Sequence, residues 1–161
     1  PLGRIGLRAE RGEPRDSRLT LDEQRTLLTL WCMARSPLML GGDLPSSTPE
    51  TLALLATPAI AEVIQGSTDG RELLREPLDG GELIVWAARA AATDRAYVAI
   101  FWTGVEELDA TVPLASVLGT GHGPVTVSDL WAASSPSTLD GAAIRASVPA
   151  HGVAWVALDG A

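Results

Sequence analysis

The side chains best suited to chemistry in this sequence are carboxylates, because 161 residues include only one cysteine and two histidines. Asp109, Asp129 and Asp140 each border a short apolar run or lie in a turn. Aspartate is favoured at such positions because its carboxylate hydrogen-bonds the local backbone. We see no pair among these three with a reason to act as catalytic acid and nucleophile.

The histidines and the cysteine do not form a metal-ligand pattern. His122 and His151 are far apart in the sequence, and Cys32 has no second cysteine near it. Cys32 lies among apolar residues in a helical pattern, where a free thiol behaves as a small buried group. His151 lies in the tight turn PAHGVA, and a hairpin role outweighs any chemistry for it. We therefore expect neither a metal nor a cofactor.

Composition narrows the classes of partner. Hydrophobic residues make up 46% of the chain and charged residues 20%, which is enough apolar surface for a packed core. The net charge of −8 argues against nucleic-acid binding, which needs a contiguous basic face. No apolar run approaches the length that crosses a bilayer. We expect neither a nucleic-acid nor a membrane partner.

Local signals predict a helix from Leu21 to Ala34. Thr20 is its expected N-cap, and Glu23 completes a capping box three residues later. The next segment, Pro37 to Leu40, is apolar at every position, which favours a strand buried on both faces of a parallel sheet. A helix that leads directly into such a strand is typical of an α/β fold.

The rest of the chain is predicted to be helical at first and then to consist of short strands. A helical stretch begins near Pro49 and is predicted to split at Pro58. From Gly80 onward, short β-branched and aromatic runs alternate with turn residues, which predicts an antiparallel β-sandwich. Residues 67–81 are rich in turn signals and are interpreted as a connection. The first part offers a single buried strand, so it is not a complete α/β domain by itself.

Six segments, in order along nearly the whole chain, match a known family: PLGRIGLRAERG, SRLTLDEQRTLLTLWCMARSPLMLGGDLPSSTPETLALL, GSTDGRELLRE, IVWAA, VSDLW and VPAHGVAWVAL. In these segments the chain resembles the C-terminal half of family 27 glycoside hydrolases, the α-galactosidase group. It departs from the family at Trp102 in IFWTG, where FNTG is usual, and in LLATPAIAEVIQ, where LLTNPEVLAVNQ is common.

The resemblance implies the last part of a (β/α)8 TIM barrel followed by a C-terminal antiparallel β-sandwich domain. Residues 1–66 would be the end of the barrel, residues 67–81 the connection and residues 82–161 the β-domain. The helix at Leu21 to Ala34 would be the seventh barrel helix, and Pro37 to Leu40 the eighth barrel strand. In such barrels the loops after the strands build the active site.

The resemblance also implies a function for the parent protein: retaining hydrolysis of terminal α-galactoside-type sugars by two aspartates. Both would lie upstream of this chain, so no catalytic residue is carried over and the chain alone is expected to be inactive. Gly3, Arg4 and Asp43 would lie at the rim of the active site. For Asp43, a turn or cap role without substrate contact outweighs a direct role.

An alternative from another class is a non-catalytic carbohydrate-binding or purely structural β-sandwich module. Trp86, Trp102, Trp131 and Trp155 could stack on sugar rings, although packing inside the sandwich is the preferred interpretation. Exposed, coplanar indoles would favour binding, and buried indoles would favour a structural role.

Overall fold

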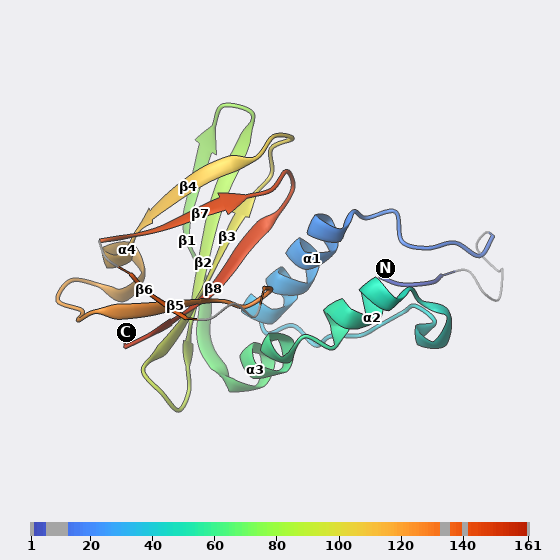
Figure 1. Ribbon diagram of the computed structural model, residues 1–161, viewed down its shortest axis with the longest axis horizontal. Helices are drawn as coiled ribbons and strands as arrows, with labels where there is room; N and C mark the ends of the chain where they lie inside the picture. Colours follow the sequence, from blue (N-terminus) through green and yellow to red (C-terminus); the bar gives the residue numbers. More distant parts are fainter. Residues whose placement is uncertain (1, 6–12, 133–135, 140–141, 161) are drawn as a thin grey trace.

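A computed structural model describes residues 2–5, 13–132, 136–139 and 142–160, and Asp140 lies outside these ranges. A helical lead, residues 13–66, packs against a β-sandwich (Figure 1). The lead contains three α-helices and one short 3₁₀ helix: α1 (Leu21–Met33), η1 (Leu44–Ser46), α2 (Pro49–Leu55) and α3 (Pro58–Gly66). The sandwich follows with β1 (Ser67–Leu78), β2 (Gly81–Ala90), β3 (Arg95–Trp102), β4 (Leu108–Pro113), α4 (Leu114–Leu118), β5 (Val125–Asp129), β6 (Ser137–Leu139), β7 (Ala143–Val148) and β8 (Val153–Asp159).

Helix α1 begins at the predicted capping box. The Thr20 hydroxyl accepts a hydrogen bond from the Glu23 amide at 3.2 Å, and the Thr20 amide donates to Glu23 Oε2 at 2.7 Å. The helix ends at Met33, with Ala34 as its C-cap. Pro58 separates α2 from α3, as expected, because a proline inside one continuous helix would remove a backbone hydrogen bond. Both helix predictions are confirmed.

The strand predicted at Pro37–Leu40 does not form in this structure. These residues pair with no strand among the described residues, and Met39 is 82% exposed. A parallel strand needs backbone partners on its edges, and the described strands pair only with antiparallel neighbours. No part of a barrel sheet is present in the described residues.

The predicted antiparallel sandwich is confirmed. One sheet has the strand order β1-β2-β3-β8-β5-β6, and a second sheet pairs β4 with β7. Helices α1 and α3 cover one face of the larger sheet, and the β4-β7 sheet with α4 covers the other. This arrangement explains why β3 is buried from Ala96 to Trp102 without alternation: it is the central strand of a sheet covered on both faces.

Residues 67–78, expected as part of a connection, form strand β1. It pairs with β2 from Ser67↔Ala90 to Leu78↔Gly81, with two register irregularities on the way. Strand β1 is the edge of the sheet and is mostly exposed, so Asp69, Gly70 and Pro77 are tolerated within it. These residue types are common in turns, which is why the sequence predicted a connection here and not a strand.

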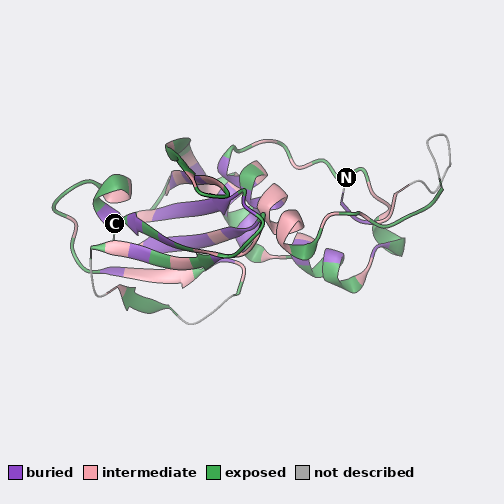
Figure 2. Ribbon diagram, turned by 90° about the horizontal axis from the view of Figure 1, so that it is seen from above, coloured by how far each residue is buried: buried purple, intermediate pink, exposed green. Residues whose placement is uncertain are grey.

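Two apolar clusters lie on the two faces of the larger sheet. Leu28, Met33 and Val63 from the helices pack with sheet residues such as Phe101 and Trp155. Figure 2 shows the buried residues concentrated in the strands of the sandwich, while the helical lead is mostly exposed or intermediate. Among the described residues, no helix combines the length and apolarity needed to cross a membrane.

Candidate functional site

The three residues predicted to share a rim come together in the structure. Arg4 and Asp43 form an isolated antiparallel bridge, with the Asp43 amide donating to the Arg4 carbonyl at 2.7 Å. Gly3 precedes Arg4 and has a φ of +74°, a conformation that side-chain-bearing residues rarely adopt. A Cβ at Gly3 would collide with Ser47 Oγ. The chain therefore needs glycine at this position to bring the two loops together.

Ser47 joins the same group of residues, although nothing in the run PSSTP distinguishes it from its neighbours. Its hydroxyl accepts a hydrogen bond from the Arg4 amide at 3.0 Å and donates to the Asp43 carbonyl at 2.8 Å. Only 9% of Ser47 is exposed. We call Gly3, Arg4, Asp43 and Ser47 the loop cluster.

The charged groups of the loop cluster are already used within the protein. The Asp43 carboxylate is the N-cap of η1 and accepts from the amide and hydroxyl of Ser46. The Arg4 guanidinium pairs with Asp16 at 3.3 Å. The preferred interpretation of Asp43 as a turn or cap residue agrees with this geometry. The arrangement can hold two loops in register, and it presents no acid and nucleophile pair.

The cysteine lies in the helix-sheet core. Cys32 is fully buried, and this burial raises the pKa of its thiol to about 12. A thiol with so high a pKa stays protonated near neutral pH and is a poor nucleophile or metal ligand. Among the residues the structure describes, no group of three or more His, Cys, Asp and Glu side chains could hold a metal ion.

The tryptophans form no exposed row. Trp102 and Trp155 are buried, whereas Trp86 and Trp131 are half-buried. The Trp102 indole donates to the Glu106 carbonyl at 2.7 Å, and the Trp131 indole donates to Thr29 Oγ1 at 2.9 Å. The preferred interpretation of these rings as packing residues is confirmed for Trp102 and Trp155.

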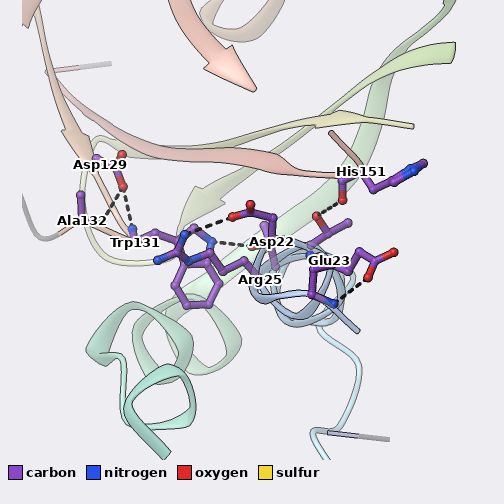
Figure 3. A network of polar contacts seen from close by, with 10 residues as sticks. Asp22, Glu23, Arg25, Asp129, Trp131, Ala132 and His151 are labelled. Atoms are coloured by element: carbon purple, nitrogen blue, oxygen red, sulfur yellow. Dashed lines mark hydrogen bonds and ion pairs between the residues drawn. The ribbon is translucent and has the colours of Figure 1, made fainter. Parts of the chain in front are cut away.

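A second polar region joins α1 to the sandwich (Figure 3). Thr26 Oγ1 donates to the backbone carbonyl of His151 at 2.9 Å, while the His151 amide donates to the Gly104 carbonyl. His151 has a φ of 50° in the β7-β8 hairpin, so the sequence was right to expect a turn role. Asp129 Oδ1 accepts from the amides of Trp131 and Ala132, which confirms its expected backbone role.

Two hollows flank this junction. One, of about 360 Å³, is mostly apolar and is lined by residues that include Leu27, Leu30 and Trp102. The other, of about 210 Å³, is lined by residues that include Asp22, Arg25 and Trp155. The junction is therefore a packed contact with open space on two sides.

Comparison with known proteins supports the family resemblance. Residues 80–158 match the family model described as the alpha galactosidase C-terminal beta sandwich domain. An α-galactosidase from Coffea arabica is 31% identical over 134 residues, which are 83% of this chain and 34% of that protein.

Two solved structures are similar to this chain over nearly its full length. The family 27 β-L-arabinopyranosidase from Geobacillus stearothermophilus superposes with a TM-score of 0.86 and 32% identity, covering 99% of this chain and 35% of that one. A Bacillus halodurans protein provisionally assigned as an α-N-acetylgalactosaminidase superposes with a TM-score of 0.86 and 30% identity, covering 99% of this chain and 37% of that one. The chain thus spans about a third of the length of the relatives it matches. It is the C-terminal part of a family 27, α-galactosidase-like protein.

Proposed function

We propose that this chain is the C-terminal portion of a retaining exo-glycosidase that cleaves a terminal α-galactoside-type sugar. In this proposal the residues of a TIM barrel precede the chain and supply both catalytic aspartates. The chain contributes the last elements of the barrel in residues 1–66 and the β-sandwich that supports them. By itself it has no turnover.

One observation carries this proposal: the superposition covers 99% of this chain but only 35% of the family 27 arabinopyranosidase. Helical lead and sandwich therefore occur together, in the same arrangement, within a much longer enzyme. The remaining two thirds of such an enzyme leave ample room for a catalytic barrel.

The outer surface of the helical lead is consistent with this proposal. Met39, Leu40, Leu44 and Leu52 expose 82%, 38%, 42% and 40% of their surface. Large apolar side chains gathered on one segment mark a surface that another part of a protein covers. Residues 37–40 would gain the ladder partners of an eighth barrel strand from the upstream barrel, which agrees with their apolar sequence.

The chemistry would follow the two-step retaining mechanism. One carboxylate attacks the anomeric carbon while a second, about 5 Å away, protonates the leaving group; the second then activates water to release the sugar. The loop cluster would shape the rim near the seventh and eighth barrel strands. Its bonded carboxylate and guanidinium suit positioning rather than proton transfer.

The direct test compares the longer protein encoded by the same reading frame with the 161-residue chain. Both are assayed on aryl α-galactoside and on aryl β-L-arabinopyranoside, which has the same ring configuration without the hydroxymethyl group. We expect hydrolysis by the longer protein alone, with net retention at the anomeric carbon. Equal activity of the short chain, or no activity in a folded longer protein, would refute the proposal.

A purely structural or sugar-binding module is the competing function. The buried Trp102 and Trp155 speak against a flat aromatic platform on the sandwich surface.

A further inference from the structure

One face of α1 is only partly covered by the described residues. Glu23, Thr26, Leu27 and Leu30 are spaced three or four positions apart around the helix, so they form one stripe, and all four line the hollow of about 360 Å³. The helix buries a different set of residues, Leu28, Thr29, Cys32 and Met33. Helix α1 therefore has a second contact face that neither α3 nor the sheet covers completely.

The opposite wall of the hollow belongs to the sandwich. It is formed by Trp102 and Thr103 at the end of β3 and by His151 in the β7-β8 hairpin. The lining is mostly apolar, and Leu30 is 41% exposed at its edge. Apolar side chains gathered around a concave surface mark a place where another part of a protein packs.

Polar side chains around the hollow already have partners within the chain. Glu23 Oε2 accepts from the Thr20 amide at 2.7 Å, and Thr26 Oγ1 donates to the His151 carbonyl at 2.9 Å. Thr103 Oγ1 accepts from a backbone amide at 2.8 Å. A site for a small polar ligand needs polar groups that are free to orient it. The hollow is therefore better suited to apolar side chains of a polypeptide segment.

The position of α3 indicates which segment this is. Helix α3 follows α1 in the chain and packs with it through the cluster that contains Leu28 and Val63 (Figure 1). The helices of a (β/α)8 barrel form an outer ring in chain order, so each has the following helix on one side and the preceding helix on the other. In the proposed barrel, the preceding helix would approach the face of α1 that α3 leaves open.

The matched relatives are long enough to supply such a helix. The family 27 arabinopyranosidase superposes on 99% of this chain, which is only 35% of that enzyme. A second copy of this chain is a weaker candidate, because a stable dimer usually buries about 800 Å² on each partner and the hollow is a small concave surface beside a helix.

We propose that apolar side chains of the barrel helix that precedes α1 in the longer protein fill this hollow and pack against Leu27, Leu30 and Trp102. This inference rests on the proposed function, because it requires the upstream barrel. It adds that the β-domain touches the upstream barrel directly, through the end of β3 and the β7-β8 hairpin. The hollow would then fix how the two domains are oriented.

The test is thiol labelling of Leu30→Cys with a maleimide in the 161-residue chain and in the longer protein. The native Cys32 gives little background because it is fully buried. A covered thiol reacts only when its surroundings open, so we expect labelling roughly tenfold or more slower in the longer protein. Leu74→Cys is the matched control: Leu74 is 38% exposed on the edge strand β1, and its labelling rate should be similar in both proteins.

Cross-linking identifies the segment that covers the hollow. A maleimide-diazirine reagent is attached to the Leu30→Cys thiol of the longer protein, activated with light and followed by mass spectrometry. We expect cross-links to residues upstream of this chain within the same molecule. Circular dichroism shows that each variant is folded, and Leu27→Cys on the same stripe is used if Leu30→Cys is not.

Three outcomes would overturn the inference: equal labelling of Leu30→Cys in the two proteins, equal protection of Leu74→Cys, or cross-links only to a second copy or to residues 1–161. Galactoside hydrolysis is measured separately. A longer protein that hydrolyses the substrate but leaves Leu30→Cys reactive refutes this inference alone. One that protects Leu30→Cys but hydrolyses nothing refutes the proposed function and supports the contact.

Discussion

Packing of α1 on the larger sheet leads to a quantitative prediction for Leu28. Its side chain is completely buried in the cluster shared by the helices and the sheet. Leu28→Ala should leave a cavity and lower the free energy of unfolding by about 2–5 kcal/mol, depending on how far the neighbours relax. Leu30→Ala is a matched control on the same helix: with 41% of Leu30 exposed, we expect a loss of about 1 kcal/mol or less.

Urea denaturation with two probes measures this difference. Far-UV circular dichroism reports on the whole backbone, and fluorescence reports on the five tryptophans, of which Trp31 lies in α1 and Trp155 in β8. If helices and sheet unfold as one unit, Leu28→Ala shifts both transitions equally. The reasoning would be refuted if Leu28→Ala cost no more than Leu30→Ala. Separate transitions for the two probes would likewise show that the helical lead is not part of the same cooperative unit.

Three further predictions concern the loop cluster, the sheet edge and high pH. Asp43→Ala removes the N-cap of η1, so it should lower the free energy of unfolding by about 0.5–2 kcal/mol and reduce kcat/KM of the longer enzyme. Asp43→Asn should keep most of the stability and most of the activity, measured by urea unfolding and by aryl-galactoside hydrolysis. Equal losses in the two variants would contradict the cap role. A polypeptide of residues 82–161 lacks β1 and leaves the edge of β2 unpaired, so it should aggregate more than residues 67–161. Size-exclusion chromatography measures this, and equal aggregation of the two polypeptides would count against the pairing of β1 with β2. Burial raises the pKa of Cys32 to about 12 from 9.0. The free energy of unfolding contributed by the protonated thiol should therefore be complete below pH 9 and decline between pH 9 and pH 12. Cys32→Ala should flatten the matching decline in melting temperature, and an unchanged slope would contradict this reasoning.

The helices were predictable because their signals are local. Thr20 and Glu23 are three residues apart, and the capping box they form needs no other part of the protein. Pro58 interrupts a helix for reasons internal to the chain. The apolar runs of the sandwich were recognisable in the same way, since a central strand such as β3 is apolar at nearly every position.

Two strand predictions failed in opposite directions, and both failures have the same cause. Residues 37–40 are apolar but pair with nothing among the described residues, whereas β1 is polar and exposed but pairs along the whole of β2. A strand exists only where a neighbouring backbone accepts and donates its hydrogen bonds. Side-chain polarity reports burial, and at a sheet edge burial and pairing are different properties.

In the candidate sites, too, some residues could be selected from the sequence and others only from the structure. Resemblance to the family was enough to select Gly3, Arg4 and Asp43, which the structure brings together. Ser47, which holds their two loops in register, carried no distinguishing sequence signal. The open face of α1 at Leu30 was equally hidden, because a sequence shows that a helix carries apolar residues but not which of them other elements cover.

Sequence alone was thus sufficient for the family, the capped and proline-bounded helices and the antiparallel character of the sandwich, since these depend on residues close together along the chain. Only the folded molecule decided the strand order, the docking of α1 and α3 on the larger sheet, the meeting of Gly3 with Asp43, and the hollow beside Leu30. The physical reason is that these features arise from contacts between distant segments, whose free energy depends on which surfaces meet rather than on local preference.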